Sequence, residues 1–175
     1  MPQKQPVVIN ASPLIALSAV LSDFQTLHLV AERVLVPAEV FAEIRAGPSS
    51  DATEDMARAA ACCEVLKPFA ALPHSLTDDL GLGESAVIHT ALTRGVGLVV
   101  IDELKGRRWA RRFGLQVTGS IGLLVQLHRA GAIPSLETAF AKMKAKGIFL
   151  EDKLLQKALT LARSGKEPHP PTTNS

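Results

Sequence analysis

Short runs of β-branched and aliphatic residues alternate along this chain with longer segments in which apolar residues recur at helical spacing. Such short runs are typical of strands that are buried on both faces, as in a parallel sheet. Strands that alternate with helices indicate that helices cover both faces of that sheet. The sequence therefore predicts an α/β fold, a three-layer α/β/α sandwich with a mainly parallel central sheet.

The alternation extends over nearly the whole chain, so that elements of both kinds can be placed. Strands are expected at about 6–10, 34–36, 64–66, 97–101 and 115–117. Helices are expected at about 14–21, 23–30, 37–46, 50–63, 83–93, 103–113, 120–130, 135–146 and 152–163. Ser120, Ser135 and Asp152 are expected to cap their helices, because their side-chain oxygens can accept from free backbone N–H groups. The turn-rich segment 68–82 is expected to be a loop that approaches the functional site.

One domain is expected, because 175 residues are enough to bury a full core. We assign residues 1–164 to this domain and expect 165–175, which contain three prolines and no apolar residue able to dock, to be a disordered tail. The sequence shows neither an apolar run long enough to span a membrane nor an N-terminal secretory signal. The adjacent Cys62 and Cys63 are interpreted as small helix residues. These features predict a cytoplasmic protein.

Two of the expected strands lead into a polar side chain. Val7-Val8-Ile9 precedes Asn10, and Val99-Val100-Ile101 precedes Asp102. In open α/β folds, ligands bind at the carboxyl ends of the parallel strands. Asn10 and Asp102 are therefore expected at one edge of the sheet, as parts of a single functional site.

Two glutamates on predicted helices are candidates for the same site. Glu84 extends the apolar stripe of its helix by one turn, so its carboxylate either caps the helix or points into a shared site. Glu43 lies one turn from Val40, on the inward face of its helix, and is either a boundary residue or a site residue. Glu39, one turn earlier on the same side, is the competing candidate.

Carboxylates gathered at one edge of a sheet suit a divalent metal ion. Mg²⁺ and Mn²⁺ are hard cations that prefer carboxylate oxygens and keep bound water, and neighbouring carboxylates repel one another unless a cation joins them. A bound ion can activate water and polarise a phosphoryl oxygen. The set Asn10, Glu43, Glu84 and Asp102 therefore indicates phosphodiester hydrolysis without a covalent intermediate.

Several motifs of this chain resemble those of the PIN-domain family, a metal-dependent ribonuclease fold used by many prokaryotic toxins of toxin–antitoxin pairs. The matching motifs are Asn-Ala-Ser-Pro-Leu-Ile at 10–15, Val36-Pro37 followed by Val40 and Glu43, Gly-Leu-Gly-Glu at 81–84, Ile101-Asp102 with Gly-Arg-Arg at 106–108, and Thr-Gly-Ser at 118–120. The resemblance spans about residues 6–163, and the combination of motifs is fairly specific for one mostly uncharacterised subgroup.

The resemblance implies that Glu43, Glu84 and Asp102 bind a Mg²⁺ or Mn²⁺ ion. It also implies an acid at position 10, where this chain has Asn10. An amide supplies a neutral carbonyl oxygen where a carboxylate would supply charge, so lower metal affinity is expected and catalytic activity is open. The partners that the resemblance implies are an RNA substrate, an antitoxin protein and a second copy of the chain.

A cluster of basic residues follows Asp102 directly. Its members are Lys105, Arg107, Arg108, Arg111 and Arg112. A net charge of +2 does not by itself predict nucleic-acid binding, and such a cluster is either a solvated helix face or a set of phosphate contacts beside the acids. Ser12 and Ser120 are weaker candidates for contacts to water or phosphate, and helix capping is the alternative for both.

Two functions remain open from the sequence. The first is a metal-dependent endoribonuclease in which Glu84 and Asp102 hold the ion, Glu43 binds or orients the attacking water, and Asn10 assists. The second is a PIN-like module with weakened metal affinity that binds RNA or a protein partner without cleavage. Nucleotide binding on a Rossmann-like sheet is poorly supported, because no Gly-rich phosphate turn follows the first strand.

Overall fold

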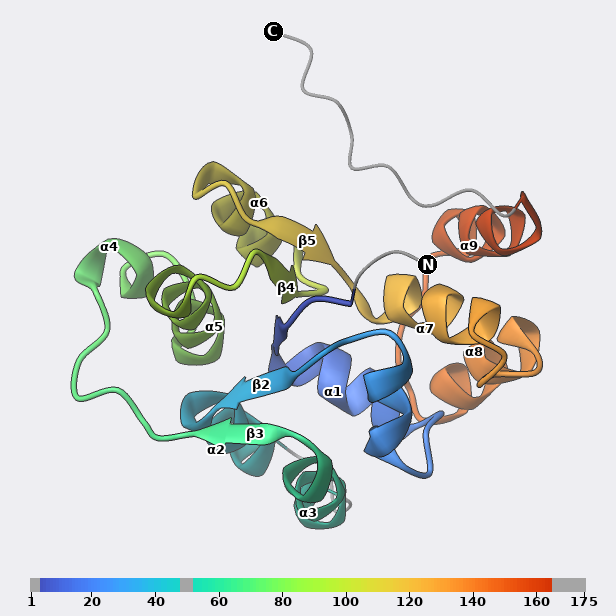
Figure 1. Ribbon diagram of the computed structural model, residues 1–175, viewed down its shortest axis with the longest axis horizontal. Coiled ribbons are helices and arrows are strands. Elements are labelled where there is room, and N and C mark those ends of the chain that lie inside the picture. Colours follow the sequence, from blue (N-terminus) through green and yellow to red (C-terminus); the bar gives the residue numbers. More distant parts are fainter. Residues whose placement is uncertain (1–3, 48–51, 165–175) are drawn as a thin grey trace, which may run out of the picture.

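The computed structural model describes residues 4–47 and 52–164, and in these ranges five strands form one all-parallel sheet (Figure 1). The strands are β1 Val7–Ile9, β2 Val34–Pro37, β3 Glu64–Leu66, β4 Leu98–Val100 and β5 Gln116–Thr118, in the spatial order β3-β2-β1-β4-β5. Helices pack on both faces of the sheet, so the predicted α/β/α sandwich is confirmed. The predicted tail at 165–175 lies outside the described residues.

The central strand is β1, which is buried on both faces as its β-branched sequence predicts. Val8 pairs with Leu35 of β2 and with Val99 of β4. The chain runs outward from β1 through β2 to β3, and then returns to β4 on the other side of β1. The strand order therefore reverses between β1 and β4, and in open α/β sheets the carboxyl ends of the strands at such a point form the ligand-binding crevice.

The helices lie in two layers. They are α1 Ala11–Ser18, the 3₁₀ helix η1 Phe24–Leu29, α2 Ala38–Ala46, α3 Ala52–Cys62, α4 His74–Thr77, α5 Leu82–Arg94, α6 Leu104–Arg112, α7 Ser120–Arg129, α8 Leu136–Ala145 and α9 Asp152–Ser164. The helix α5 packs against β1, β2 and β4, and α6 packs against β5, whereas α1 packs against α2, α3 and α7. Figure 1 shows α5 and α6 on one side of the sheet and α1 and α7 on the other, as right-handed crossovers require.

Three elements differ from the prediction. The first helix begins at Ala11, earlier than expected, because Asn10 occupies the N-cap position. The segment predicted as a helix at 23–30 is the 3₁₀ helix η1, whose N-cap Asp23 accepts a hydrogen bond of 2.8 Å from the backbone N–H of Gln25. The segment predicted as a loop at 68–82 contains the short helix α4.

One of the three predicted helix caps is confirmed. The hydroxyl of Ser135 accepts a hydrogen bond of 3.1 Å from the backbone N–H of Thr138 at the start of α8. Ser120 is the first residue of α7, and Gly119 is its N-cap. Asp152 is likewise the first residue of α9 and not its cap; a carboxylate in the first turn still interacts favourably with the helix dipole.

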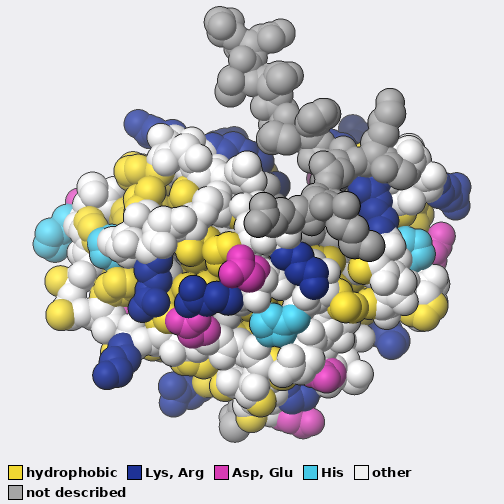
Figure 2. All heavy atoms as spheres, in the orientation of Figure 1, with side chains coloured by type: hydrophobic (Ala, Val, Ile, Leu, Met, Phe, Trp, Pro, Cys, Tyr) yellow, Lys and Arg dark blue, Asp and Glu magenta, His cyan; other side chains and the backbone are white. Residues whose placement is uncertain are grey.

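The face of the molecule seen in Figure 2 carries basic, acidic and hydrophobic side chains interspersed with one another. Glu64, at the start of β3, forms ion pairs of 2.5 Å with Arg33 and 3.6 Å with Arg94. Exposed ion pairs contribute little to stability, so the fold depends mainly on its aliphatic core. In the part of the chain that is described, no helix is long and apolar enough to cross a membrane.

The adjacent cysteines are both free thiols. Cys62 is the last residue of α3, as predicted, whereas Cys63 follows the helix. Burial raises the pKa of the Cys63 thiol to about 12, and a neutral thiol of this kind is a poor nucleophile. The structure therefore supports a packing role for Cys63.

Candidate functional site

Asn10 lies at the reversal point of the strand order, directly after β1. It is 1% exposed, and its backbone N–H donates to the carbonyl of Val100 on β4 at 3.0 Å. Although Asn10 is the N-cap residue of α1, its side chain makes no capping hydrogen bond. Its Nδ2 donates to Oε2 of Glu103 at 3.5 Å, and its buried Oδ1 has no hydrogen-bond partner among the described residues. The side chain is thus directed to the candidate site and away from the helix backbone.

Asp102 lies at the same edge, beyond the end of β4. Its Oδ1 accepts a hydrogen bond of 2.8 Å from the backbone N–H of Ser120, at the start of α7. Burial raises the pKa of Asp102, and the charge of Glu103 acts in the same direction; hydrogen bonds from Ser120 and the charge of Arg107 oppose the shift. Asp102 is therefore held at a helix N-terminus, where an anion is favoured.

Glu84 makes the capping contact that was one of its two expected roles. Its Oε2 accepts a hydrogen bond from the backbone N–H of Gly81 at 3.4 Å, as a residue in the first turn of a helix can. Its Oε1 is buried and has no hydrogen-bond partner among the described residues. Burial raises the pKa of Glu84, and the charges of Glu103 and Glu43 raise it further. One oxygen thus serves the helix, and the other is free to serve a ligand.

Glu43 and its competitor Glu39 have separate partners. Oε1 of Glu43 accepts a hydrogen bond of 2.8 Å from the backbone N–H of Gly83, next to Glu84. Oε1 of Glu39 accepts a hydrogen bond of 2.7 Å from the backbone N–H of Phe69, in the loop after β3. Glu43 is therefore the glutamate of α2 that joins Glu84, and Glu39 anchors a loop.

Three carboxylates of the site lie against glycines. A Cβ atom added to Gly83 would collide with the carboxylate of Glu43, and one added to Gly106 would collide with that of Glu84. A Cβ added to Gly119 would lie 2.6 Å from Oδ1 of Asp102. Any side chain larger than hydrogen at these positions would displace a carboxylate, so the glycines are part of the construction of the site.

Glu103 belongs to this group although the sequence interpretation did not select it. Its carboxylate accepts hydrogen bonds from Nδ2 of Asn10 and from Oγ of Ser12, and its charge acts on both Glu84 and Asp102. The sequence prediction chose the first polar residue after the strand, and that residue is Asp102. The signal that was available is the doublet itself, since Asp102 and Glu103 are adjacent acids at a strand end.

The side-chain oxygens of this site are of the chemical type that a hard divalent cation binds. Asn10 Oδ1 and Glu84 Oε1 are buried and, where the chain is described, have no hydrogen-bond partner. Carboxylate and amide oxygens are ligands that Mg²⁺ and Mn²⁺ prefer. Within residues 4–47 and 52–164, no three His, Cys, Asp or Glu side chains are grouped closely enough to hold a metal ion. One oxygen of Asp102, Oδ1, already accepts a hydrogen bond from the backbone N–H of Ser120.

The basic cluster lies on α6, and its members have different surroundings. Arg107 is half-buried, with Nη1 donating to the carbonyl of Ile101 at 2.7 Å, and burial lowers its pKa. Lys105 lies 3.9 Å from Asp79. The remaining members are exposed; they are Arg108, Arg111 and Arg112. Arg112 lies over the ring of Trp109, 5.0 Å from its centroid, and Trp109 stacks on Phe113.

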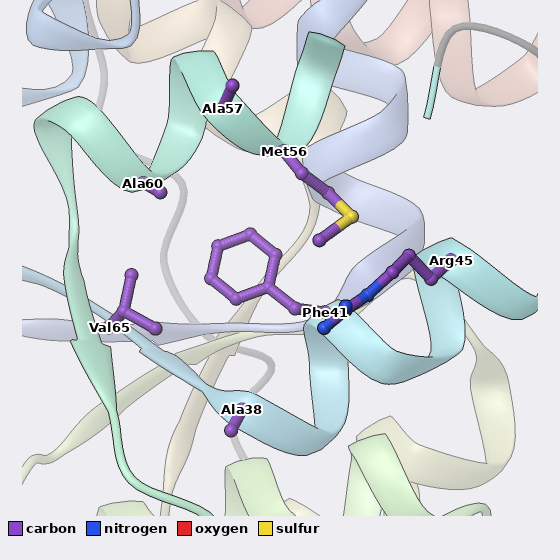
Figure 3. Close-up of a pocket in the computed structure, with 7 residues that line it drawn as sticks. All are labelled: Ala38, Phe41, Arg45, Met56, Ala57, Ala60 and Val65. Carbon is purple, nitrogen blue, oxygen red and sulfur yellow. The ribbon is translucent and has the colours of Figure 1, made fainter. Parts of the chain in front are cut away.

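A separate hollow of about 360 Å³ lies between α2, α3 and β3 (Figure 3). Figure 3 shows Phe41, Met56 and Val65 lining it, with Arg45 at one side. None of the candidate metal-binding or RNA-binding residues lines it. This hollow is therefore distinct from the acidic site.

The family model described as DUF3368: PIN domain matches residues 6–164. No curated protein matches the chain. PIN domains are typically nucleases, and they typically use a divalent metal ion. The matched range includes all five strands and every acid of the site. This chain belongs to the PIN-domain family.

Proposed function

We propose that this protein is a Mg²⁺- or Mn²⁺-dependent endoribonuclease that hydrolyses RNA phosphodiester bonds. The observation that carries the proposal is the pair of buried oxygens, Asn10 Oδ1 and Glu84 Oε1, that have no hydrogen-bond partner among residues 4–47 and 52–164. Asn10 lies at the reversal point of the sheet and bonds Glu103, whose charge acts on Glu84. Buried polar atoms are nearly always satisfied in folded proteins. Unpartnered oxygens at a ligand-binding crevice are best explained by a ligand that binds there.

Each acid has a role that follows from its surroundings. Glu84 and Asp102 would hold the ion, and Asn10 would add its carbonyl oxygen. When bound, such an ion activates water and neutralises charge on the phosphate. Glu43, whose Oε1 accepts a hydrogen bond from Gly83 beside Glu84, would orient the attacking water. Burial raises the pKa of both Glu84 and Asp102, and a bound cation would act in the opposite direction by favouring the ionised carboxylates.

RNA binding needs cations beside the acids, because an acidic site repels a polyanion. The exposed Arg108, Arg111 and Arg112 would supply them from α6, the helix that follows Asp102 in the chain. Arg107 serves differently, since its guanidinium bonds the Ile101 carbonyl and lies near Asp102. We assign the first three to phosphate contacts and Arg107 to positioning Asp102. Ser12 donates to Glu103 and Ser120 holds Asp102, so both serines support acids.

The alternative is a PIN-like module that binds RNA or a protein partner without cleavage. Two observations favour it: position 10 carries a neutral amide, and the described acids do not form a group of three around one point. The two functions differ in one measurable respect. Only the nuclease turns RNA over in the presence of a divalent ion.

The proposal includes a toxin role, with an antitoxin protein and a second copy of the chain as partners. Its support is the resemblance of the motifs to a fold that many prokaryotic toxins use, together with the match to the PIN-domain model. Growth arrest on expression, relieved by the product of an adjacent small gene, tests the toxin role. Sedimentation of the full chain with and without that product tests both partner assignments.

The experiment that tests the nuclease is cleavage of a labelled single-stranded RNA by the full chain with Mn²⁺. We expect cleavage that requires Mn²⁺ and is lost in Asp102→Asn and Glu84→Gln. The matched control is Glu54→Gln, which neutralises an exposed acid in the first turn of α3, and which should cleave like the wild type. RNA binding without any turnover would favour the binding module, and equal cleavage by all variants would refute the site.

A further inference from the structure

We propose that Glu103 is the carboxylate that replaces the acid missing at position 10, and that Asn10 and Ser12 hold it in the site. This inference rests on the proposed function, because it adds a residue to the same metal-binding edge. It also gives Asn10 a specific role. The side-chain amide of Asn10 holds the carboxylate of Glu103, and that carboxylate supplies the negative charge that a neutral residue at position 10 lacks.

The contacts of Glu103 carry the proposal. Its Oε1 accepts a hydrogen bond from Oγ of Ser12, and its Oε2 accepts one of 3.5 Å from Nδ2 of Asn10. Both donors come from the beginning of α1, which follows β1, while Glu103 precedes α6. Each carboxylate oxygen of Glu103 therefore accepts a hydrogen bond from the segment that follows β1, and these two hydrogen bonds fix the orientation of the side chain.

Asn10 is suited to this role because an amide has both a donor and an acceptor. Its Nδ2 donates to Glu103, and its Oδ1 has no partner within the described part of the chain although the residue is only 1% exposed. An aspartate at position 10 has no donor to offer Glu103, and its charge would repel the Glu103 carboxylate at this distance. The amide thus binds Glu103 with one atom and leaves one oxygen for a cation or its bound water.

Glu103 also lies within electrostatic reach of the two acids that the proposal assigns to the ion. A Cβ added to Gly106, three residues after Glu103, would collide with the carboxylate of Glu84, so the start of α6 lies against that acid. The charge of Glu103 acts on both Glu84 and Asp102. Glu103 is therefore a neighbour of Asp102 in the chain and of Glu84 in the fold, and a divalent ion bound at this edge would offset the repulsion between these carboxylates.

A purely structural role predicts different behaviour. Glu103 could simply receive donors from the beginning of α1 and stabilise the packing of α1 against the loop before α6. In that case its removal would lower the stability of the fold and leave the affinity for a divalent ion unchanged. Mn²⁺ affinity, measured without RNA, separates the two roles.

The test is calorimetric titration of Mn²⁺ into the full chain and four variants: Glu103→Gln, Glu103→Asp, Asn10→Asp and the double exchange Asn10→Asp with Glu103→Gln. We expect Glu103→Gln to weaken Mn²⁺ binding by about 10- to 100-fold and Glu103→Asp to weaken it less. The double variant carries its carboxylate at position 10 instead of position 103, and it should recover most of the Mn²⁺ affinity that Glu103→Gln loses. Glu54→Gln is the control for a distant acid, and thermal unfolding without metal confirms that each variant is folded.

Unchanged Mn²⁺ affinity in Glu103→Gln, with weakened binding in Glu84→Gln, would overturn the role of Glu103 and leave the nuclease proposal intact. If Glu103→Gln binds Mn²⁺ more weakly but the wild type never cleaves RNA, the role of Glu103 in metal binding would be supported and the nuclease proposal would be refuted. A double exchange that binds no better than Glu103→Gln alone would also refute the replacement of one carboxylate by the other.

Discussion

Glu43 on α2 accepts a hydrogen bond of 2.8 Å from the backbone N–H of Gly83, the residue before Glu84 on α5. This contact joins two acid-bearing helices that pack against each other, although the two residues are 40 positions apart in the chain. It also explains why glycine occupies position 83, since a Cβ there would meet the Glu43 carboxylate. The arrangement of the site can therefore be tested at positions that carry no acid.

Gly83→Ala should disable the site without removing any carboxylate. The added methyl group collides with Glu43, and displacement of about 1 Å at a catalytic site can reduce activity by about 100-fold. The unfolding free energy should fall by about 1–3 kcal/mol through overpacking. Gly97→Ala is the control, because its Cβ would meet only Gln5 Oε1 at 3.9 Å. Wild-type RNA cleavage by Gly83→Ala would contradict the placement of Glu43.

The stability of the metal-free protein should depend on the protonation of Glu84. Burial, and then the charges of Glu103 and Glu43, raise its pKa above the ordinary 4.5, so the folded protein binds this proton more tightly than the unfolded chain does. Protonated Glu84 therefore stabilises the fold. This contribution to the free energy of unfolding is fully present below the ordinary pKa and is lost as the pH rises through the raised pKa of the folded protein. Denaturant unfolding across this range should show that loss in the wild type. Glu84→Gln, which has no titrating carboxyl here, should show a smaller pH dependence; an identical profile for both proteins would be inconsistent with the shift.

Arg108→Ala should weaken RNA binding by a sequence-independent amount. Removing one phosphate contact lowers the slope of log affinity against log salt by about 1, and Mn²⁺ affinity should stay the same because Arg108 is exposed on α6. Fluorescence anisotropy of a labelled RNA at several salt concentrations measures the slope. Lys157→Ala on α9 removes an exposed charge far along the chain and serves as the control. Equal salt slopes for the two variants would refute the phosphate contact.

Val8→Ala should destabilise the fold strongly, because Val8 has no exposed surface in the central strand. The loss of two methyl groups and the cavity that remains should cost about 2 kcal/mol. Val65→Ala on the edge strand β3, where the side chain is 44% exposed, should change stability by no more than about 0.5 kcal/mol. Denaturant unfolding of the two variants compares them directly, and equal effects would contradict the assignment of β1 to the centre of the sheet.

The fold was predictable because its strands are short, aliphatic and buried on both faces. The runs at Val7–Ile9 and Leu98–Val100 could be recognised from residue type alone, and they are neighbours in the sheet. The placement of Asn10 and Asp102 at one edge followed from the parallel arrangement. The limits of α1 and η1 were less predictable, because helix boundaries depend on which residue occupies the cap.

The directions of the acidic side chains could not be read from the sequence. Periodicity gives the face of a helix on which Glu84 lies, but its two oxygens have different surroundings, and only the packing against Gly106 and Gly81 distinguishes them. Asp102 was placed correctly at the strand end, yet its carboxylate is held by the backbone of a residue in α7. Glu103 was missed because its donors are on α1, which is distant in sequence and close only in the folded chain.

The central claim is that the acidic edge of this sheet binds a divalent cation, and a calorimetric titration of Mn²⁺ into the wild type and Glu84→Gln tests it most directly. We predict saturable Mn²⁺ binding by the wild type, in which Oε1 of Glu84 is buried without a hydrogen-bond partner among the residues that the structure describes. In Glu84→Gln we predict binding weakened by at least about 10-fold. Absence of saturable Mn²⁺ binding by the folded wild type, or equal affinity in the two proteins, would contradict the account.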